Sequence, residues 1–354
     1  MAHKPCNMYN SRSNKMILSL VVIGAIIMVL AFVPMSTIGQ QSEQTFTTHS
    51  GAVIKTSGQV LDPLYTESTL EFDPMEFLRN FEYGTVTHLK DGTTLREFTI
   101  VADDDHIMEI SPGIFYNVWT FNGTVPGPTI RATEGDLVRI HFINNGSKPH
   151  TMHFHGIHAA EFDGVFESVG PGGQFVYEWI ADPVGVHPYH CHIMPLEEHI
   201  SHGLYGVYIV DPKEPRPLAD EMVMVLNGFD TDFDTENNLY AANTIPFYYQ
   251  HHPIRIETKD LIRIYVVNMV EFDAINNFHL HGNLYHYYPT GTDTVPSFYT
   301  DMITLSQTER GIMEFVYNYP GKYVFHAHKT EFSEKGWVGM FAVSDSRGSE
   351  EYES

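Results

Sequence analysis

Residues 190–192 read His190-Cys191-His192 and hold the only cysteine that follows Cys6. If the hydrophobic N-terminus is removed on export, Cys191 has no partner for an intramolecular disulfide and is better interpreted as a thiolate metal ligand. A thiolate together with imidazoles is the ligand set of a blue-copper electron-transfer site. Neighbouring side chains on a strand point to opposite faces, so His190 and His192 would point away from this copper, toward a second metal centre.

The sequence around this motif occurs twice. Asp136-Leu-Val-Arg-Ile140 recurs as Asp260-Leu-Ile-Arg-Ile264, and the alternation of apolar residues predicts a strand in each copy. Four further elements recur in the same order: residues 153–156 with 279–282, 175–177 with 315–317, 190–192 with 326–328, and 203–210 with 336–343. Five elements in one order predict two copies of one β-domain. The copies differ in chemistry, because Ala327 takes the place of the cysteine in the second.

We therefore predict an all-β protein with two tandem domains. The 354 residues suffice for two cores, and 27 glycines, 20 prolines and 13% aromatic residues suit β-domains with many turns. The predicted first domain spans residues 95–212 and the second 213–345, with a proline-rich linker at the junction. Residues 40–94 are predicted to form an N-terminal arm or spacer, and residues 346–354 an acidic tail.

An uncharged apolar run from Met16 to Val33 follows a basic leader. It is just long enough to span a bilayer, so residues 1–39 are expected to be a signal peptide or a membrane anchor. Either reading places the rest of the chain outside the cytoplasm, secreted, in a periplasm-like space, or anchored to the outer face of the membrane. The formal charge of -24 repels nucleic acid and attracts cations, so we expect no nucleic-acid partner.

Four His-x-His pairs lie at matching places in the two copies of the repeat: residues 153 and 155, 190 and 192, 279 and 281, and 326 and 328. On a strand, residues i and i+2 share a face, so each pair presents two imidazoles to one space. Eight imidazoles from two related domains could surround several metal ions, and imidazole suits copper, zinc, iron and nickel. A structural zinc site is less well supported, because a single cysteine does not suggest a closed zinc site.

The thiolate site needs further ligands near Cys191. His150 lies three residues before the first His-x-His pair, and His199 lies eight residues after the cysteine. Leu204 occupies the place where an axial methionine is expected, and leucine cannot coordinate a metal. Loss of a weak axial donor should raise the potential of the copper. His202 and Met194 stay open as rival donors.

Three motifs resemble those of the multicopper oxidases: Phe121-Asn-Gly-Thr-Val-Pro-Gly-Pro-Thr129, His150-Thr-Met-His-Phe-His155-Gly, and His190-Cys-His192. The resemblance covers about residues 95–345. The two-domain layout is similar to the laccase-like type B branch of that family and to copper nitrite reductase. This resemblance implies two cupredoxin-like Greek-key β-barrels assembled as a homotrimer, with the catalytic metal between domain one of one subunit and domain two of its neighbour.

The resemblance also implies four coppers per subunit. His150, Cys191 and His199 would hold a type 1 copper beside the non-coordinating Leu204. The remaining ligands would form a trinuclear cluster: His153 and His279 for the type 2 copper, and His155, His190, His192, His281, His326 and His328 for the type 3 pair.

The implied reaction is one-electron oxidation of a small reductant at the type 1 copper, coupled to four-electron reduction of O2 to water at the cluster. The reductant could be a phenol, an aromatic amine, Cu(I) or a small nitrogen compound such as hydroxylamine. Asp163 and Glu331, which follow the first and last His-x-His pairs, are candidate proton relays, with an ordinary solvated acid as the alternative for each.

Two other functions stay open. A copper nitrite reductase, which converts nitrite to nitric oxide, would leave His192, His281 and His328 without a role. A non-catalytic copper electron carrier would leave all eight paired histidines unused. Copper content separates the three hypotheses, at four, two and one per subunit.

Overall fold

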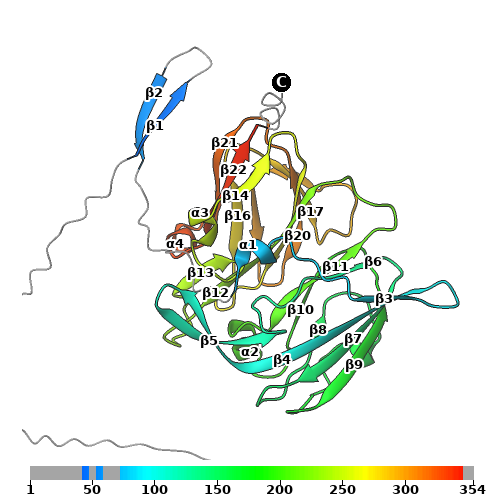
Figure 1. The fold of residues 1–354 in the computed structure, drawn as a ribbon. Helices are drawn as coiled ribbons and strands as arrows, with labels where there is room; N and C mark the ends of the chain where they lie inside the picture. Colours follow the sequence, from blue (N-terminus) through cyan, green and yellow to red (C-terminus); the bar gives the residue numbers. More distant parts are fainter. Residues whose placement is uncertain (1–41, 48–52, 59–71, 346–354) are drawn as a thin grey trace, which may run out of the picture. The chain divides into compact units, whose positions relative to one another are not determined.

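The computed structural model describes residues 42–47, 53–58 and 72–345 (Figure 1). The predicted signal peptide or anchor and the acidic tail lie outside the described residues. Over the part of the chain that is described, no helix has the length and apolar character to cross a membrane. Strands β1 (Ser42–Thr47) and β2 (Val53–Gly58) form a separate antiparallel hairpin.

The first domain consists of two sheets with the strand orders β3-β4-β7-β9 and β6-β11-β10-β8, and β5 pairs with β4. Its strands are β3 (Thr85–His88), β4 (Thr94–Ser111), β5 (Ile114–Phe121), β6 (Ile130–Thr133), β7 (Leu137–Asn144), β8 (His153–Phe154), β9 (Gln174–Ile180), β10 (Gly185–His190) and β11 (Tyr205–Asp211). The predicted strand at residues 136–140 is the start of β7, and its alternate residues Val138, Ile140 and Phe142 are fully buried. Strand β3 lies in the range predicted as the N-terminal arm, yet it pairs with β4.

The second domain has the strand orders β13-β12-β15-β20-β17-β18 and β14-β22-β21-β16-β19. Its strands are β12 (Asp220–Phe229), β13 (Leu239–Ala242), β14 (Ile254–Glu257), β15 (Ile262–Asn268), β16 (Asn276–Leu280), β17 (Tyr285–Pro289), β18 (Phe298–Thr300), β19 (Met302–Leu305), β20 (Arg310–Phe315), β21 (Gly321–His326) and β22 (Val338–Ser344). Five short helices, α1 (Pro74–Phe77), η1 (Ala160–Phe162), α2 (Leu196–Ser201), α3 (Tyr248–His251) and α4 (Thr330–Glu334), complete the described elements. The all-β prediction is therefore confirmed.

The two domains share one topology, as the sequence repeat predicts. Strand β7 runs parallel to β4 and antiparallel to β9, and β15 runs parallel to β12 and antiparallel to β20. In the other sheet, β11 runs parallel to β6 and antiparallel to β10, and β22 relates to β14 and β21 in the same way. Equivalent motifs of the repeat consequently occupy equivalent positions in the two domains.

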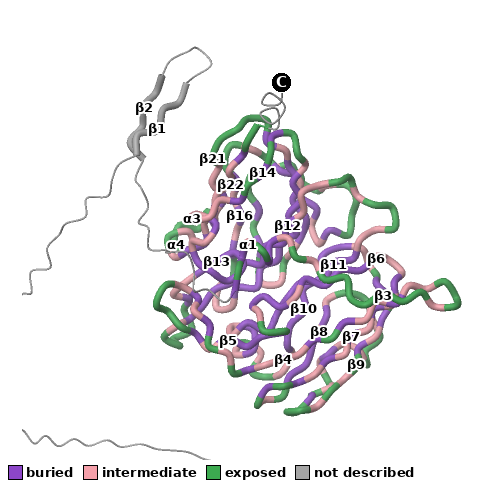
Figure 2. The backbone as a smooth tube through the Cα atoms, in the orientation of Figure 1, coloured by how far each residue is buried: buried purple, intermediate pink, exposed green. Residues whose placement is uncertain are grey.

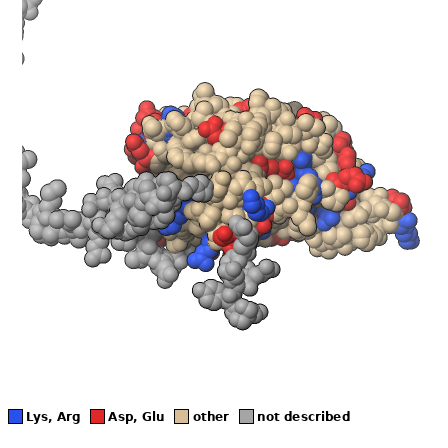
Figure 3. Space-filling model, turned by 90° about the horizontal axis from the view of Figure 1, so that it is seen from above, with Lys and Arg blue, Asp and Glu red and all other residues tan. Residues whose placement is uncertain are grey.

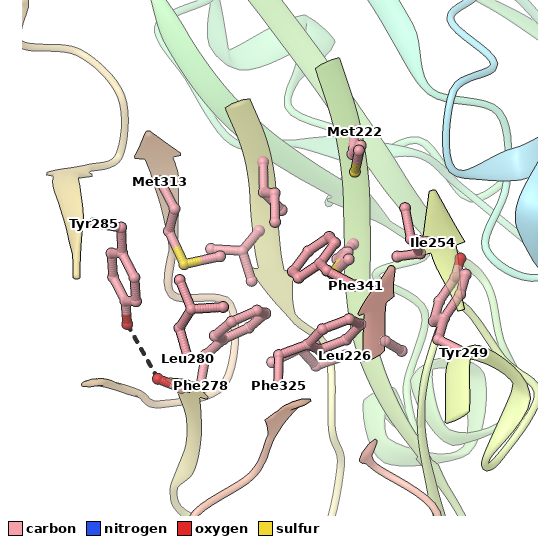
Figure 4. Packing of buried hydrophobic residues seen from close by; sticks show 14 of the residues in the cluster. Met222, Leu226, Tyr249, Ile254, Phe278, Leu280, Tyr285, Met313, Phe325 and Phe341 are labelled. Carbon is pink, nitrogen blue, oxygen red and sulfur yellow. Dashed lines mark hydrogen bonds between the residues drawn. The ribbon is translucent and has the colours of Figure 1, made fainter. Parts of the chain in front are cut away.

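Aromatic and aliphatic side chains fill the second domain between its sheets (Figure 4). Phe278 stacks on Phe325 with 5.7 Å between ring centroids, and the Tyr285 hydroxyl donates to the Phe278 carbonyl at 3.1 Å. Because residues on the same strands alternate between faces, this packing fixes which face carries the histidines.

A second apolar cluster joins the domains. Val186 of β10 and Val207 of β11 pack in one cluster with Val225 of β12 and Val267 of β15. Figure 2 shows β10 and β11 buried along almost their whole length, because one face meets the domain core and the other meets the second domain. Burial of this apolar surface stabilises the contact between the domains, at about 25 cal/mol per Å².

Charged groups reinforce this domain contact. The buried Arg131 guanidinium pairs with Asp211 and with Glu221, each at 2.7 Å, and Arg263 also pairs with Glu221 at 2.9 Å. Burial alone would raise the pKa of Glu221, but hydrogen bonds from Arg131 and Tyr265 outweigh it and lower the pKa to about 2. On the face seen in Figure 3, acidic side chains stand in separate groups with basic ones among them.

Candidate copper centres

The predicted thiolate ligands come together at one end of the first domain. Cys191 directly follows β10, His150 precedes β8, and His199 lies on α2. The Cys191 Sγ atom is 3.2 Å from His199 Nδ1 and 3.8 Å from His150 Nδ1. At most 2% of any of these three residues is exposed. One thiol and two imidazole nitrogens thus converge in a closed, apolar space.

The protonation states of these three side chains favour the binding of a metal ion. Burial lowers the pKa of His199 to about 4 and also lowers that of His150, so both rings are neutral near pH 7. Burial raises the pKa of the Cys191 thiol, so a bound cation would displace the proton and stabilise the thiolate. The donor set and its geometry fit copper of the type 1 kind.

Asp104 on β4 forms a hydrogen bond with Nε2 of His150, the ring nitrogen that faces away from Cys191. Its Oδ2 atom lies 3.1 Å from His150 Nε2 and accepts the Lys148 backbone N–H at 2.8 Å. Burial would raise the pKa of Asp104, but hydrogen bonds from Ser147, Lys148 and His150 lower it. The carboxylate therefore accepts from Nε2 and leaves Nδ1 directed at Cys191, which is how outer groups orient metal-bound histidines.

The structure places the two rival ligands, His202 and Met194, and the predicted axial residue, Leu204. His202 Nδ1 donates to the Asn117 carbonyl at 2.6 Å, and its ring stacks on Trp119, outside the group that contains Cys191. Met194 is 76% exposed. Leu204 is fully buried, accepts the Cys191 N–H at 3.0 Å and donates to the His199 carbonyl at 3.1 Å.

The first group of imidazoles contains His153, His155 and His190, whose ligand atoms lie within 4.8 Å of one another. His192 joins them, with its ring centroid 5.2 Å from that of His153. His190 Nδ1 donates to the Cys191 carbonyl at 2.9 Å, so its Nε2 carries a lone pair. That Nε2 lies 3.3 Å from His155 Nε2.

The second group repeats this arrangement with His279, His281 and His326. The His328 ring is 5.3 Å from the His279 ring. His326 Nδ1 donates to the Ala327 carbonyl at 2.6 Å, and its Nε2 lies 2.9 Å from His281 Nε2. Because burial lowers the pKa of both His281 and His326, lone pairs converge here, as a metal ion requires.

One carboxylate residue accompanies each group. His153 Nδ1 donates to the Asp163 carbonyl at 2.7 Å and lies 3.2 Å from its Oδ1. His279 Nδ1 donates to the Asp301 carbonyl at 3.0 Å and lies 3.6 Å from its Oδ2. The counterpart of Asp163 is therefore Asp301, which sequence reasoning missed. Glu331, the other candidate relay, pairs instead with Lys335 at 2.9 Å and with Lys329 at 3.7 Å.

The two imidazole groups lie on the outer faces of different sheets. Cys191 belongs to the core of the first domain, so the alternation of side chains places His190 on the opposite face of β10. Ala327 belongs to the core of the second domain, so His326 lies on the opposite face of β21.

The first domain packs against the other sheet of the second domain. Val223 and Val225 of β12 belong to the interdomain cluster, whereas their neighbours Met222 and Met224 belong to the core of the second domain. The sheet containing β12 therefore stands between the first domain and the sheet that carries the second imidazole group. The two groups therefore lie apart from each other within one chain.

Comparisons with known proteins identify the family. Sequence models of the multicopper oxidases match residues 108–215 and 216–347. A crystal structure of a multicopper oxidase is 52% identical, covers 78% of this chain and 98% of that chain, and superposes with a TM-score of 0.77. The chain belongs to the multicopper oxidase family and is an oxidoreductase of that copper-binding group.

Nitrite reductases are also similar. The copper-containing nitrite reductase of Neisseria meningitidis is 27% identical over 268 residues, which is 69% of this chain and 68% of that protein. The structure of the copper nitrite reductase from Nitrosomonas europaea is 27% identical, covers 71% of this chain and 94% of that chain, and has a TM-score of 0.66. The site residues therefore have to distinguish between the two reactions.

Proposed function

We propose that this protein couples one-electron oxidation of a small reductant to four-electron reduction of O2 to water. One observation carries the proposal: the second domain repeats the imidazole group of the first, including His281 and His328, which a nitrite reductase does not need. Two equivalent groups of four imidazoles fit a trinuclear copper cluster better than a single copper held by three.

The ligand assignment follows the resemblance and is supported by the contacts above. His150, Cys191 and His199 would hold the type 1 copper, and His153 and His279 the type 2 copper. The type 3 pair would be held by His155, His190, His192, His281, His326 and His328. Four coppers held by these residues would supply the one-electron chemistry that a four-electron reduction of O2 needs.

The protein side chains supply insulation, connection and protons. Apolar packing excludes water from Cys191, and its covalent neighbours His190 and His192 connect the two sites through a few bonds. The hydrogen bond from His190 to the Cys191 carbonyl, 2.9 Å long, shortens that connection. Asp163 and Asp301 are better placed than Glu331 to exchange protons near the imidazoles.

A full cluster would need a second copy of the chain. The two groups lie on outer faces separated by a sheet, so the first group of one subunit would meet the second group of its neighbour. Because this contact joins two different surfaces, its repetition forms a ring when the rotation between subunits closes, and the homotrimer implied by the resemblance is the ring that we propose. Residues 1–39 would export the chain, and domains bounded at 95–212 and 213–345 would form the ring.

A mixing experiment tests the shared site. His155→Ala disables the first group and His326→Ala the second, and neither variant alone should consume O2. Co-refolded or co-expressed variants should regain roughly a quarter of the wild-type rate, because random rings of three contain one intact junction in most cases. If mixtures stay inactive while wild type treated identically recovers, the cluster is not shared between subunits.

The nitrite reductase alternative rests on the similarity of the chain to those enzymes. It predicts two coppers per subunit, nitric oxide from nitrite, and no effect of His328→Ala on turnover. The oxidase proposal predicts four coppers per subunit in the wild-type protein, and loss of O2 uptake in the His328→Ala variant.

A further inference from the structure

The type 1 ligands are closed to direct contact with a reductant. His199 is 2% exposed and His150 is fully buried. Trp119, whose ring lies 4.9 Å from that of His199 and 5.7 Å from that of His150, is only 3% exposed. An electron that enters this site must therefore pass through the residues that cover it.

A column of nearly parallel rings leads from Trp119 to the surface. His202 stacks on Trp119 at 4.7 Å and 17°, and Tyr116 stacks on His202 at 5.3 Å and 25°. Phe233 stacks on Tyr116 at 6.1 Å and on His202 at 6.4 Å. Of these four rings, Phe233 alone is largely exposed, at 68%.

Phe233 is held in this position at some energetic cost. It lies in the loop between β12 and β13 of the second domain, and this loop reaches across to the type 1 site of the first. Its φ is 60°, in the left-handed region that L-residues with large side chains rarely adopt. The Phe233 ring therefore offers an exposed aromatic face next to Tyr116 and His202.

Charge around the column differs between its two ends. Asp232, Asp234 and Glu236 are exposed beside Phe233. At the other end, the Lys148 ammonium sits 4.6 Å over the Trp119 ring. Lys148 is itself paired with Glu198 at 2.6 Å, so its charge is balanced, whereas the carboxylates beside Phe233 attract a cation to that end of the column.

We propose that the reductant is a small cationic aromatic molecule that docks on Phe233, and that its electron reaches the type 1 site through Tyr116, His202 and Trp119. Trp119 is the last ring of this route, since it packs on His202 at 4.7 Å and on the type 1 ligand His199 at 4.9 Å. Each donor loses one electron, and four such losses with four protons convert one O2 to two waters. The inference rests on the proposed oxidase function and names its donor class.

The test compares two ferrocene donors of opposite charge, (ferrocenylmethyl)trimethylammonium and ferrocenecarboxylate, with the full copper-loaded chain. Phe233→Ala should lower kcat/KM for the cationic donor roughly fivefold, the value of one lost stacking and cation–π contact. Phe233→Leu should behave like the alanine variant, and Phe233→Tyr should retain the wild-type value. Tyr319→Ala, which removes another exposed aromatic ring, is the matched control and should change neither donor.

Substitutions of the acidic residues give an independent test of the proposal. Asp232→Asn and Asp234→Asn should each lower kcat/KM for the cationic donor about threefold at low ionic strength, and the loss should disappear in high salt. Glu334→Gln removes an exposed carboxylate elsewhere and is the control for net charge.

Binding is measured separately from turnover. Saturation-transfer NMR should detect the ring protons of phenyltrimethylammonium on wild-type protein and on Tyr319→Ala, and lose them on Phe233→Ala. The proposal is overturned if this signal survives in Phe233→Ala, or if the variant slows both ferrocenes equally. A wild-type chain that oxidises no donor with O2 would refute the oxidase function, while the NMR result would still decide the docking site.

Discussion

Asp104 supports the type 1 site from outside, so Asp104→Asn should damage both the fold and the copper affinity. Every partner of the carboxylate is a hydrogen-bond donor: Ser147 N–H at 2.8 Å, Lys148 N–H at 2.8 Å, the Ser147 hydroxyl at 3.3 Å and His150 Nε2 at 3.1 Å. An asparagine keeps one acceptor oxygen but turns an NH2 group toward some of these donors.

The magnitude follows from these contacts. A buried donor without a partner costs about 1–3 kcal/mol, and a hydrogen bond to a charged group contributes about 1.5–3 kcal/mol. With Asp104 only 6% exposed, solvent cannot replace the lost bonds. We expect the free energy of unfolding of the copper-free protein to fall by roughly 2–4 kcal/mol. Copper retention by the type 1 site should fall about 10- to 100-fold, as for other outer-shell changes.

Two assays check this prediction. Urea unfolding of the copper-free chain gives the change in stability, and decay of the blue absorption during titration with a chelator gives the change in copper affinity. Asp105→Asn is the matched control, since the neighbouring side chain is exposed. If Asp104→Asn matched Asp105→Asn within about 0.5 kcal/mol and kept its copper, the orienting role of Asp104 would be refuted.

Four further variants test other parts of the site. Cys191→Ser should abolish the blue absorption and O2 uptake but leave the circular dichroism spectrum unchanged; a variant that stays blue contradicts the type 1 assignment. Leu204→Met should lower the type 1 potential in a redox titration, and an unchanged potential would mean that residue 204 is not axial. Asp301→Asn should slow O2 uptake roughly tenfold and alter its pH profile, whereas Glu331→Gln should change neither; equal losses would contradict the preference for Asp301. Because the pKa of Glu221 is depressed to about 2, the stability that this carboxylate contributes is complete above about pH 4.5 and is lost as the pH falls toward 2. Glu221→Gln should therefore make the free energy of unfolding fall less steeply between these pH values. An unchanged dependence of stability on pH would refute the role of this domain contact.

Much of the fold could be predicted because the repeat and the strand alternation are local signals. The five repeated elements predicted two domains of one topology, and the side-chain period of two placed Cys191 and its flanking histidines on opposite faces. Strand β3 was missed because its four residues are all exposed and show no apolar alternation.

The residues around the ligands were harder to predict. Asp163 lies eight positions after His155, but Asp301 lies twenty after His281, because β17, β18 and the loop between them intervene. No spacing rule could relate the two carboxylates. Asp104 stands among three consecutive aspartates, and only the inward alternation along β4 singles it out.

The ring column could not be predicted at all from sequence. It combines Tyr116 and Trp119 of β5, His202 after α2, and Phe233 from the other domain. Only the packing of the two domains brings these residues together. The same packing separated the two imidazole groups of one chain, which the sequence repeat alone left undecided.

Copper content per subunit, measured together with O2 uptake and its product, tests the central claim most directly. The account predicts close to four coppers per chain and O2 consumed to water with a generic one-electron donor. Close to two coppers per chain, with nitrite reduced to nitric oxide and O2 ignored, would contradict it and establish the nitrite reductase reaction instead.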